Sequence, residues 1–315
     1  MQLDPDAKTV LDMVKAAGRP PFHTITPQEA RVFYAAGRTV LQPEPQDVAE
    51  VKNLTAPGPH GEIPLRLYRG KHTQAGQALP CLVYFHGGGW VLGDLDSHDT
   101  VCRRLANQTD GCVVSVDYRM APEHVFPAAV DDSAAAVRFV AAQAGSLGID
   151  PSRIAVGGDS AGGNLAAVMA LMARDGNIPP VCLQLLIYPA TDFAATSDAY
   201  RRITDGYPLT APTMLWFRDL YLRGEADWYD WRASPSRAAT LAGCAPAMVI
   251  TCSHDPLVDE GIAYAQRLEA EGVRVMHTHF SDQIHGFLTM GKLIKAAGIA
   301  HDLSAAALRG AWGTS

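Results

Sequence analysis

The sequence of 315 residues lacks the features of several specialised classes of protein. It has no block of basic residues and a net charge of −7, so a nucleic-acid partner is not expected. No apolar stretch is long enough to span a bilayer, and residues 1–6 lack the basic and apolar regions of a signal peptide. The six cysteines include no C-x-x-C pair, which favours reduced thiols. We therefore expect a cytoplasmic protein without stable membrane insertion.

What the sequence does contain is an alternation of apolar runs and amphipathic stretches, with 48% hydrophobic residues overall. Strands that are apolar on both faces and separated by helices indicate an α/β fold, with a mostly parallel sheet covered by helices on both faces. The predicted strands are 81–85, 112–116, 153–157, 182–188, 248–252 and 275–280, with 48–55 and 65–69 as antiparallel edge strands. The predicted helices are 100–108, 128–144, 165–174, 257–271 and 286–297.

Two stretches interrupt this alternation. Residues 1–45 are predicted to be helical without a strand partner, and residues 191–235 form an insertion dense in aromatic residues between two core strands. Ligands of such sheets bind beyond the carboxyl ends of the strands, where the insertion must emerge. We therefore predict that both stretches form a helical cap over the site, while 46–190 and 236–315 form the two parts of the core. The alternative is that they are surface helices whose aromatic residues only dock them.

The segment 158–162, Gly-Asp-Ser-Ala-Gly, has the pattern of a catalytic turn. It follows a predicted strand and precedes a predicted helix, which is the order found in a nucleophile elbow. Such a turn is so tight that a Cβ at either end would collide with a neighbouring strand or helix. It exposes the serine hydroxyl above the sheet, so Ser160 is the candidate nucleophile.

Acyl transfer by a serine also needs a base, a group that orients the base and donors for the oxyanion. Residues 86–90 read His-Gly-Gly-Gly-Trp, and consecutive glycines let backbone N–H groups turn toward one point. We predict that Gly88, Gly89 and Ala161 supply the oxyanion donors. Asp255 and His285 each follow a predicted strand, at the sheet edge where catalytic groups gather, and are the candidate acid and base.

Other residues compete for these roles. Asp259 and Glu260 are rival acids, but both are expected inside the following helix, whose N-terminal end they would favour. The consecutive residues 97–99, Ser-His-Asp, cannot form a relay among themselves and are interpreted as a helix start. His277 and His279 could share one face of a strand as metal ligands, but no third ligand is in view, so neither a metal nor another cofactor is predicted.

Together these segments resemble the hormone-sensitive-lipase-like family of α/β-hydrolase carboxylesterases. The resemblance covers roughly residues 50–300 and rests on the segments 86–90, 117–124, 126–129, 158–164, 255–261 and 285–287. It implies an α/β-hydrolase fold with a helical cap, and a cofactor-free enzyme that hydrolyses esters of short to medium acyl chains. It also implies that Ser160 is the nucleophile, that Asp255 orients His285, and that the three predicted amides bind the oxyanion.

Several alternatives stay open at this stage. The same triad could serve an amidase, a deacetylase or an acyltransferase, and the fold could serve a small-molecule receptor that has lost catalysis. The substrate is expected to be a small-molecule ester in an apolar pocket lined by cap aromatics, for which the candidates are Phe33, Tyr34, Trp216 and Phe217. The last predicted strand, 275–280, is expected to be an exposed edge that could pair with a second copy in a homodimer.

Overall fold

An eight-stranded sheet forms the centre of the computed structural model, which describes residues 2–74 and 76–314. The spatial order of the strands is β1-β2-β4-β3-β5-β6-β7-β8. β1 pairs antiparallel with β2, and β2 with β4, whereas the remaining pairs are parallel. The predicted parallel sheet with antiparallel strands at one edge is thus confirmed. The strands are β1 (Glu50–Gly58), β2 (Gly61–Arg69), β3 (Leu79–Phe85), β4 (Cys112–Val116), β5 (Ile149–Asp159), β6 (Gln184–Ile187), β7 (Ala247–His254) and β8 (Val275–Ile284).

Alternate side chains of the central strands pack into two separate cores, one on each face of the sheet. In β3, Val83 and Phe85 belong to one core, whereas Leu82 and Tyr84 belong to the other. This period of two is what a strand buried on both faces requires. The first core is covered by α4 (Ala128–Ala142), α6 (Ala161–Arg174) and α10 (Val258–Ala270), and the second by α3 (Asp99–Thr109) and α11 (Ala296–Trp312).

The prediction of a helix over 286–297 is wrong. Gly286 has a φ of 82°, and only the short 3₁₀ turn η3 (Phe287–Thr289) follows it before α11 begins. The left-handed conformation of Gly286 turns the chain sharply after β8. Phe287 and Leu288 are buried by this turn, so their burial needs no helix. The helix lies farther along the chain, where residues 296–312 pack against α3.

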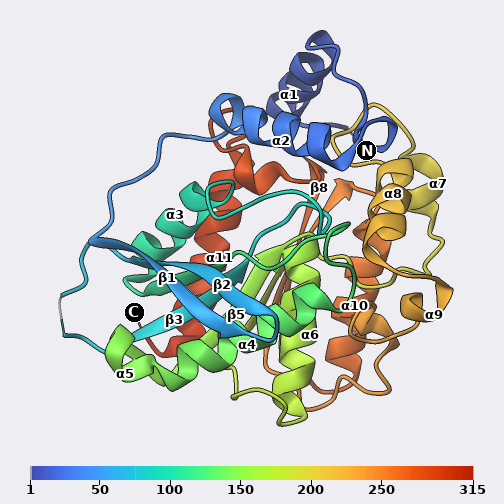
Figure 1. Cartoon of the computed structure of the whole chain (residues 1–315). Helices are drawn as coiled ribbons and strands as arrows, with labels where there is room; N and C mark the ends of the chain where they lie inside the picture. Colours follow the sequence, from blue (N-terminus) through green and yellow to red (C-terminus); the bar gives the residue numbers. More distant parts are fainter. Residues whose placement is uncertain (1, 75, 315) are drawn as a thin grey trace.

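The N-terminal segment and the insertion supply the helices that lie beyond the ends of the strands (Figure 1). They are α1 (Pro5–Ala16), η1 (Phe22–Thr24), α2 (Pro27–Leu41), α7 (Asp198–Arg202), α8 (Ala211–Tyr221), α9 (Glu225–Trp228) and η2 (Pro235–Arg237); a further short helix, α5 (Ala144–Leu147), lies in the core part of the chain. Thr26 and Glu29 form a reciprocal capping box at the start of α2. The two segments also touch, because His23 Nδ1 lies 3.0 Å from the hydroxyl of Thr213 in α8.

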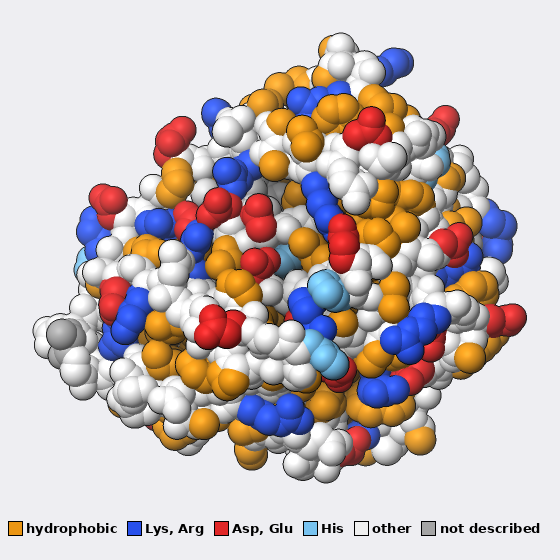
Figure 2. All heavy atoms as spheres, in the orientation of Figure 1, with side chains coloured by type: hydrophobic (Ala, Val, Ile, Leu, Met, Phe, Trp, Pro, Cys, Tyr) orange, Lys and Arg blue, Asp and Glu red, His pale blue; other side chains and the backbone are white. Residues whose placement is uncertain are grey.

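Exposed hydrophobic side chains gather over these outer helices. Figure 2 shows them at the top of the molecule, whereas charges of both signs are mixed over the rest of the visible face. Met13, Val14 and Val32 on α1 and α2, and Leu215 on α8, are among the exposed apolar residues. Within the described residues, no helix has the length and apolar character needed to cross a membrane.

Candidate active site

Ser160 occupies a strained turn between β5 and α6. Its φ of 56° and ψ of −117° lie outside the regions that a serine usually adopts. A Cβ on either Gly158 or Gly162 would collide with the carbonyl oxygen of Phe85 at the end of β3. The two glycines therefore allow the turn to press against the neighbouring strand, as predicted for a nucleophile elbow. Ser160 is also the N-cap residue of α6, so the positive end of the helix dipole points at it.

Three side chains that are far apart in the sequence meet at this turn. His285 Nε2 lies 2.9 Å from Ser160 Oγ, and His285 Nδ1 lies 2.7 Å from Asp255 Oδ2. Each of the three residues directly follows a strand, namely β5, β7 or β8. Because these strands are parallel, their carboxyl ends share one edge of the sheet. The sequence-predicted residues are thus brought together in hydrogen-bonding series.

Burial and neighbouring groups fix the orientation of this chain of hydrogen bonds. Asp255 is fully buried, and its second oxygen, Oδ1, accepts the N–H of Leu257 at 2.8 Å. The thiol of Cys252 lies 3.6 Å from Oδ2. The ring of Tyr188 packs against the imidazole of His285 with 4.6 Å between centroids. Ser160 and His285 are each 8% exposed, so little of either side chain is open to solvent.

The loop that follows β3, residues 86–90, places backbone amides beside the serine turn. We call it the oxyanion loop after the role predicted for its amides. Gly88 and Gly89 have φ values of 123° and 62°, a left-handed run that favours glycine. Among the described residues, the N–H groups of Gly88, Gly89 and Ala161 donate to no protein acceptor. His86 braces the loop from behind, because its Nδ1 lies 2.8 Å from the carbonyl oxygen of Gly87 and its ring stacks on Tyr118. Burial lowers the pKa of His86 to about 4.

Comparison with known proteins agrees with this geometry. A sequence profile of the α/β-hydrolase fold matches residues 82–289. The chain is 46% identical to the carboxylic ester hydrolase LipN of Mycobacterium tuberculosis over 258 residues, which cover 80% of this chain and 68% of LipN. It is 38% identical to an ethyl acetate hydrolase of Pseudomonas putida over 305 residues, which cover 94% and 95% of the two chains. The chain belongs to the hormone-sensitive-lipase-like family of α/β-hydrolase carboxylesterases.

Solved structures of α/β hydrolases extend the similarity to almost the whole chain. An ester hydrolase from the metagenome of Lake Arreo, complexed with a derivative of bipyridine phosphonate, superposes with a TM-score of 0.95 at 40% identity. The match covers 99% of this chain and 100% of that one. An esterase from the archaeon Pyrobaculum calidifontis superposes with a TM-score of 0.91, also at 40% identity, over 98% and 99% of the two chains.

In this hydrolase the rival acids lie at the start of α10 and contact the inserted segment. Asp259 accepts the N–H of Ala199, and Glu260 accepts the N–H of Thr191 at 2.6 Å. Burial raises the pKa of Glu260 well above its usual value. Both carboxyl groups thus hold the two ends of the 191–199 segment, whereas Asp255 alone of the three acids contacts His285.

The histidine pair on β8 finds partners within the sheet. His277 Nε2 and His279 Nδ1 lie 2.8 and 2.9 Å from the hydroxyl of Thr251 on β7. Burial lowers the pKa of each imidazole. Within the described residues, no three His, Cys, Asp or Glu side chains form a group that could hold a metal ion.

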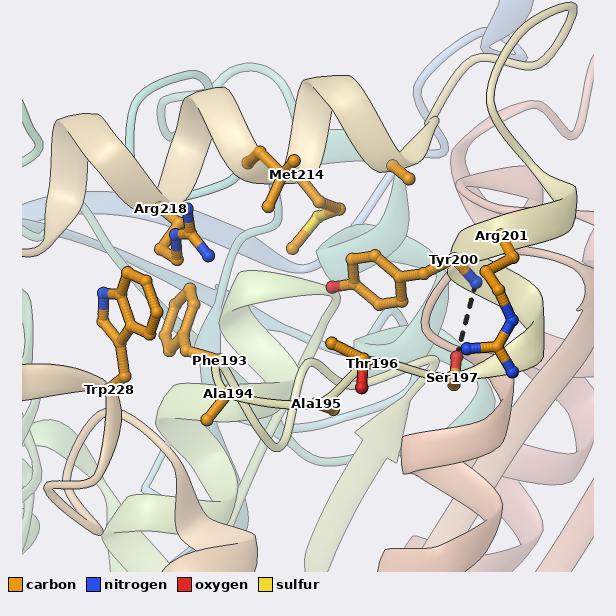
Figure 3. A pocket seen from close by; sticks show the side chains of 12 residues that line it. Phe193, Ala194, Ala195, Thr196, Ser197, Tyr200, Arg201, Met214, Arg218 and Trp228 are labelled. Carbon is orange, nitrogen blue, oxygen red and sulfur yellow. Dashed lines mark hydrogen bonds between the residues drawn. The ribbon is translucent and has the colours of Figure 1, made fainter. Parts of the chain in front are cut away.

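An apolar cavity of about 290 Å³ lies between α8 and the segment that follows β6 (Figure 3). Met214 points into it from α8, the phenol of Tyr200 crosses it, and Phe193 and Trp228 close one end. Phe193 in turn packs against Trp90 of the oxyanion loop at 4.9 Å between ring centroids. The cavity is lined by Phe193, Ala194, Ala195, Thr196, Ser197, Tyr200, Arg201, Ala211, Met214, Leu215, Arg218 and Trp228.

The four cap aromatics expected to contact the substrate are not among the residues that line this cavity. Phe217 covers the oxyanion loop so closely that a Cβ on Gly89 would collide with its ring. Trp216 packs beside Phe217, and Phe33 lies under the guanidinium of Arg19. Burial raises the pKa of Tyr34, with the charge of Asp159 adding to the effect. Substrate contact by these four residues stays a prediction.

Sequence reasoning missed a polar group that surrounds Asp159, the residue before the serine. Asp159 contacts Tyr84, Gly87 and His98 in the interior. The sequence did contain a signal for this group. Asp159 is a charged residue within a segment predicted to be a buried strand and tight turn, and a buried carboxylate requires polar partners.

Proposed function

We propose that this protein is a serine carboxylesterase that hydrolyses esters of short to medium acyl chains through an acyl-enzyme. The observation that carries the proposal is the unbroken series from Ser160 Oγ through His285 to Asp255, at 2.9 and 2.7 Å. In this proposal Ser160 is the nucleophile, His285 the general base and Asp255 the group that orients it. The names of its relatives as ester hydrolases support the same reaction.

Acylation begins when His285 takes the proton of Ser160 as the oxygen attacks the ester carbonyl carbon. The carbonyl π electrons move onto the oxygen, and the amides of Gly88, Gly89 and Ala161 would bind this oxyanion. Losing one such donor typically costs about 3–4 kcal/mol. The intermediate collapses with cleavage of the bond to the leaving alcohol, which receives its proton from His285. Asp255 stabilises the imidazolium meanwhile.

Deacylation repeats these steps with water as the nucleophile. His285 removes a proton from water, the hydroxide attacks the acyl carbon, and the bond to Ser160 Oγ breaks as His285 returns the proton to it. Because only a neutral imidazole can accept the proton, each of the two steps requires His285 in its neutral form.

One observation supports acyl chains of short to medium length. One relative is named an ethyl acetate hydrolase. We further propose that residues 1–45 and 191–235 act as the cap of this site, supported by the contact of His23 with Thr213 and of Phe217 with Gly89.

The decisive test replaces the nucleophile. Ser160→Ala should lower kcat for p-nitrophenyl butyrate by about 10⁵–10⁶, the range for a triad serine in a serine protease. Ser146→Ala, at an exposed serine in α5, is the matched control and should keep full activity. Near-normal hydrolysis by Ser160→Ala would refute the proposed mechanism.

Three further measurements define the reaction. A fluorophosphonate probe should label Ser160, and failure to label a folded protein would favour a non-catalytic receptor. An ester series from acetate to long acyl chains should show its maximum at short to medium length. Matched amides should react more slowly, whereas faster amide cleavage would favour an amidase or deacetylase.

A further inference from the structure

A buried polar cluster lies behind the oxyanion loop and has no part in the steps above. Its centre is Asp159, whose Oδ1 accepts the hydroxyl of Tyr84 at 2.7 Å and the N–H of Gly87 at 3.1 Å. The Nε2 atom of His98 lies 3.0 Å from the same oxygen, at ion-pair distance. Asp159 is 4% exposed, and His98 is fully buried. Both groups are therefore removed from water.

We propose that Asp159 and His98 are positioning residues, which hold the oxyanion loop in register with the serine turn and do so as a charge-compensated pair. This inference rests on the proposed esterase function, because it assigns the two residues to the alignment of that oxyanion hole. Neither side chain would touch the substrate. They act through the backbone amides that do.

The position of Asp159 in the chain explains why its carboxylate can align the hole. Its own backbone leads directly into Ser160 and Ala161, which supply the nucleophile and one amide. Its side chain holds Gly87, which leads directly into Gly88 and Gly89 and their two amides. The two halves of the hole come from different strands, β3 and β5, and the carboxylate joins them.

The backbone of the oxyanion loop packs closely against the Asp159 carboxylate. A Cβ on Gly87 would collide with the Asp159 carboxylate, so the loop backbone lies directly against it. Tyr84, which also contacts Oδ1, is the penultimate residue of β3 before the loop. An oxyanion hole depends on donors that are already aligned before reaction, and a carboxylate fixed from several sides supplies that alignment.

His98 is needed because the carboxylate alone would oppose catalysis. A negative charge behind the amides would repel the oxyanion as it forms, and burial strengthens such interactions. Burial by itself would raise the pKa of Asp159, but the interaction with His98 and the hydrogen bond from Tyr84 outweigh it, so the pKa is lowered. His98 Nε2 lies 3.0 Å from this carboxylate, so a positive charge on the imidazole would offset the charge of Asp159.

The surroundings of His98 hold it in this place. Its Nδ1 lies 2.9 Å from the hydroxyl of Ser97, and that hydroxyl is anchored in a turn with Asp94. Stability alone does not account for such a pair, since desolvation offsets much of the attraction between buried charges. The contacts of Asp159 with Gly87 and with His98 instead indicate a role in positioning the oxyanion loop.

Four variants of the full-length enzyme test the proposal. Asp159→Asn keeps an oxygen for Gly87 and Tyr84 without the charge, whereas Asp159→Leu removes the acceptor at similar size. His98→Gln leaves the carboxylate without its counter-charge, and the double variant Asp159→Asn with His98→Gln restores neutrality. Concentrations of active sites are determined by titration with a fluorophosphonate, so that kcat refers to folded enzyme.

We expect Asp159→Leu to lower kcat for p-nitrophenyl butyrate by about 10²–10³, the effect of losing an oxyanion donor. KM should change little, and the affinity for a trifluoromethyl ketone should fall by the same factor as kcat/KM. Asp159→Asn should retain most of the activity. The double variant should exceed His98→Gln in kcat on the order of tenfold, within the range for coupled buried neighbours.

The matched control is Asp132→Asn, which removes the charge of a buried carboxylate paired with Arg119 outside the site. It should lower Tm without changing kcat per active site. If Asp159→Leu keeps the parent kcat per active site, or if the double variant is no better than His98→Gln, the positioning role is overturned. If Asp159→Leu does not fold, the comparison of His98→Gln with the double variant decides. An unmodified protein that neither labels nor hydrolyses esters would instead overturn the proposed function.

Discussion

Backbone conformation decides which residue types the oxyanion loop accepts. Gly88 has a φ of 123°, a region that side chains strongly disfavour. A Cβ there would also collide with the carbonyl oxygen of Leu92, which lies in the next turn of the loop. The amide of Gly88 keeps its direction only with glycine at this position.

Replacing this glycine should therefore separate catalysis from folding. Gly88→Ala should lower kcat by about 10²–10³, as expected for a displaced oxyanion donor. Strain should lower the free energy of unfolding by roughly 1–3 kcal/mol. Steady-state kinetics and urea unfolding check both effects. Gly310→Ala in α11 is the control, because its Cβ meets no other atom within 4 Å, and it should raise stability by roughly 0.5–1 kcal/mol.

A histidine remote from the site makes stability depend on pH. His301 in α11 is 4% exposed, and burial lowers its pKa to about 3, with the charge of Arg104 adding to the effect. The unfolded chain binds a proton at this residue near pH 6.5, whereas the folded chain does not until about pH 3. Below pH 6.5 the unfolded state therefore binds more protons, and the free energy of unfolding falls as pH falls.

Replacing His301 by Gln should flatten this acid slope. At pH 5, His301 should lower the free energy of unfolding by roughly 2 kcal/mol relative to neutral pH, since each pKa unit corresponds to about 1.4 kcal/mol. The pKa of His86 is also lowered, so His86 likewise reduces the free energy of unfolding as pH falls. Part of the acid slope should therefore remain in the His301→Gln variant. Urea unfolding between pH 7 and pH 5 measures the difference. If the free energy of unfolding falls equally with pH in the parent and in His301→Gln, His301 is not a source of this pH dependence.

Among the elements, helix α8 couples the outer segments to the oxyanion loop. Tyr221 at its end stacks on Trp90 with 4.7 Å between centroids and meets Phe126 edge-on at 5.9 Å. Phe217, one turn earlier, lies against Gly89. A single helix thus packs both on Gly89, a predicted oxyanion residue, and on Trp90, which follows it. Changes in how α8 packs should consequently reach the catalytic loop.

Truncating Tyr221 should reveal this coupling. Tyr221→Ala removes a fully buried ring and should lower the free energy of unfolding by about 3–5 kcal/mol, with a loss of kcat as Trp90 moves. Tyr221→Phe is the matched control. Its hydroxyl has no partner among the described residues, so removing it should leave stability and kcat close to the parent values. Kinetics with active-site titration would contradict the coupling if Tyr221→Ala kept its kcat.

For the whole molecule, the sheet ends at β8, which no described strand covers on its outer side. The prediction of an edge strand there is confirmed. β8 spans Val275–Ile284, and Met276 on it is 49% exposed. Exposed backbone donors and acceptors on an edge strand can pair with another strand. We propose that β8 pairs with β8 of a second copy, because an isologous contact closes after two chains.

Light scattering of the full chain should then give the mass of two chains. Thr278→Pro removes a backbone donor from β8 and introduces a ring that disfavours pairing, so it should shift the mass toward one chain. Val51→Lys on β1, at the opposite edge of the sheet, should leave the mass unchanged and serves as the control. A monomeric mass for the parent chain at micromolar concentration would remove the proposal.

The residues of the proposed catalytic constellation could be predicted from the sequence because the constraints on them are local. The elbow needs glycines at 158 and 162 to let a turn pass the end of β3, and the oxyanion loop needs left-handed residues at 88 and 89. Such demands are met by few residue types, so the pattern itself is informative. Asp255 and His285 were found in the same way, because each directly follows an apolar run that forms a strand.

Other features depended on contacts between distant segments. The helix expected over 286–297 failed because Gly286 turns the chain and the apolar residues after it are buried by tertiary packing instead. The cavity walls could not be assigned from aromatic content, since the rotation of α8 directs Met214 into the cavity and Phe217 toward the loop. Helix orientation is set by the neighbours that a helix packs against, which its own sequence leaves undetermined.

The sequence by itself thus determined the α/β architecture, the residues of the catalytic series and the shape of the loop beside them. Only the tertiary structure decided which side chains surround the cavity, and that Asp159 and His98, 61 positions apart, meet behind the amides at 3.0 Å. The physical reason is the range of the forces involved. Turn geometry acts over a few bonds, whereas the pairing of buried charges depends on how whole strands and helices are brought together.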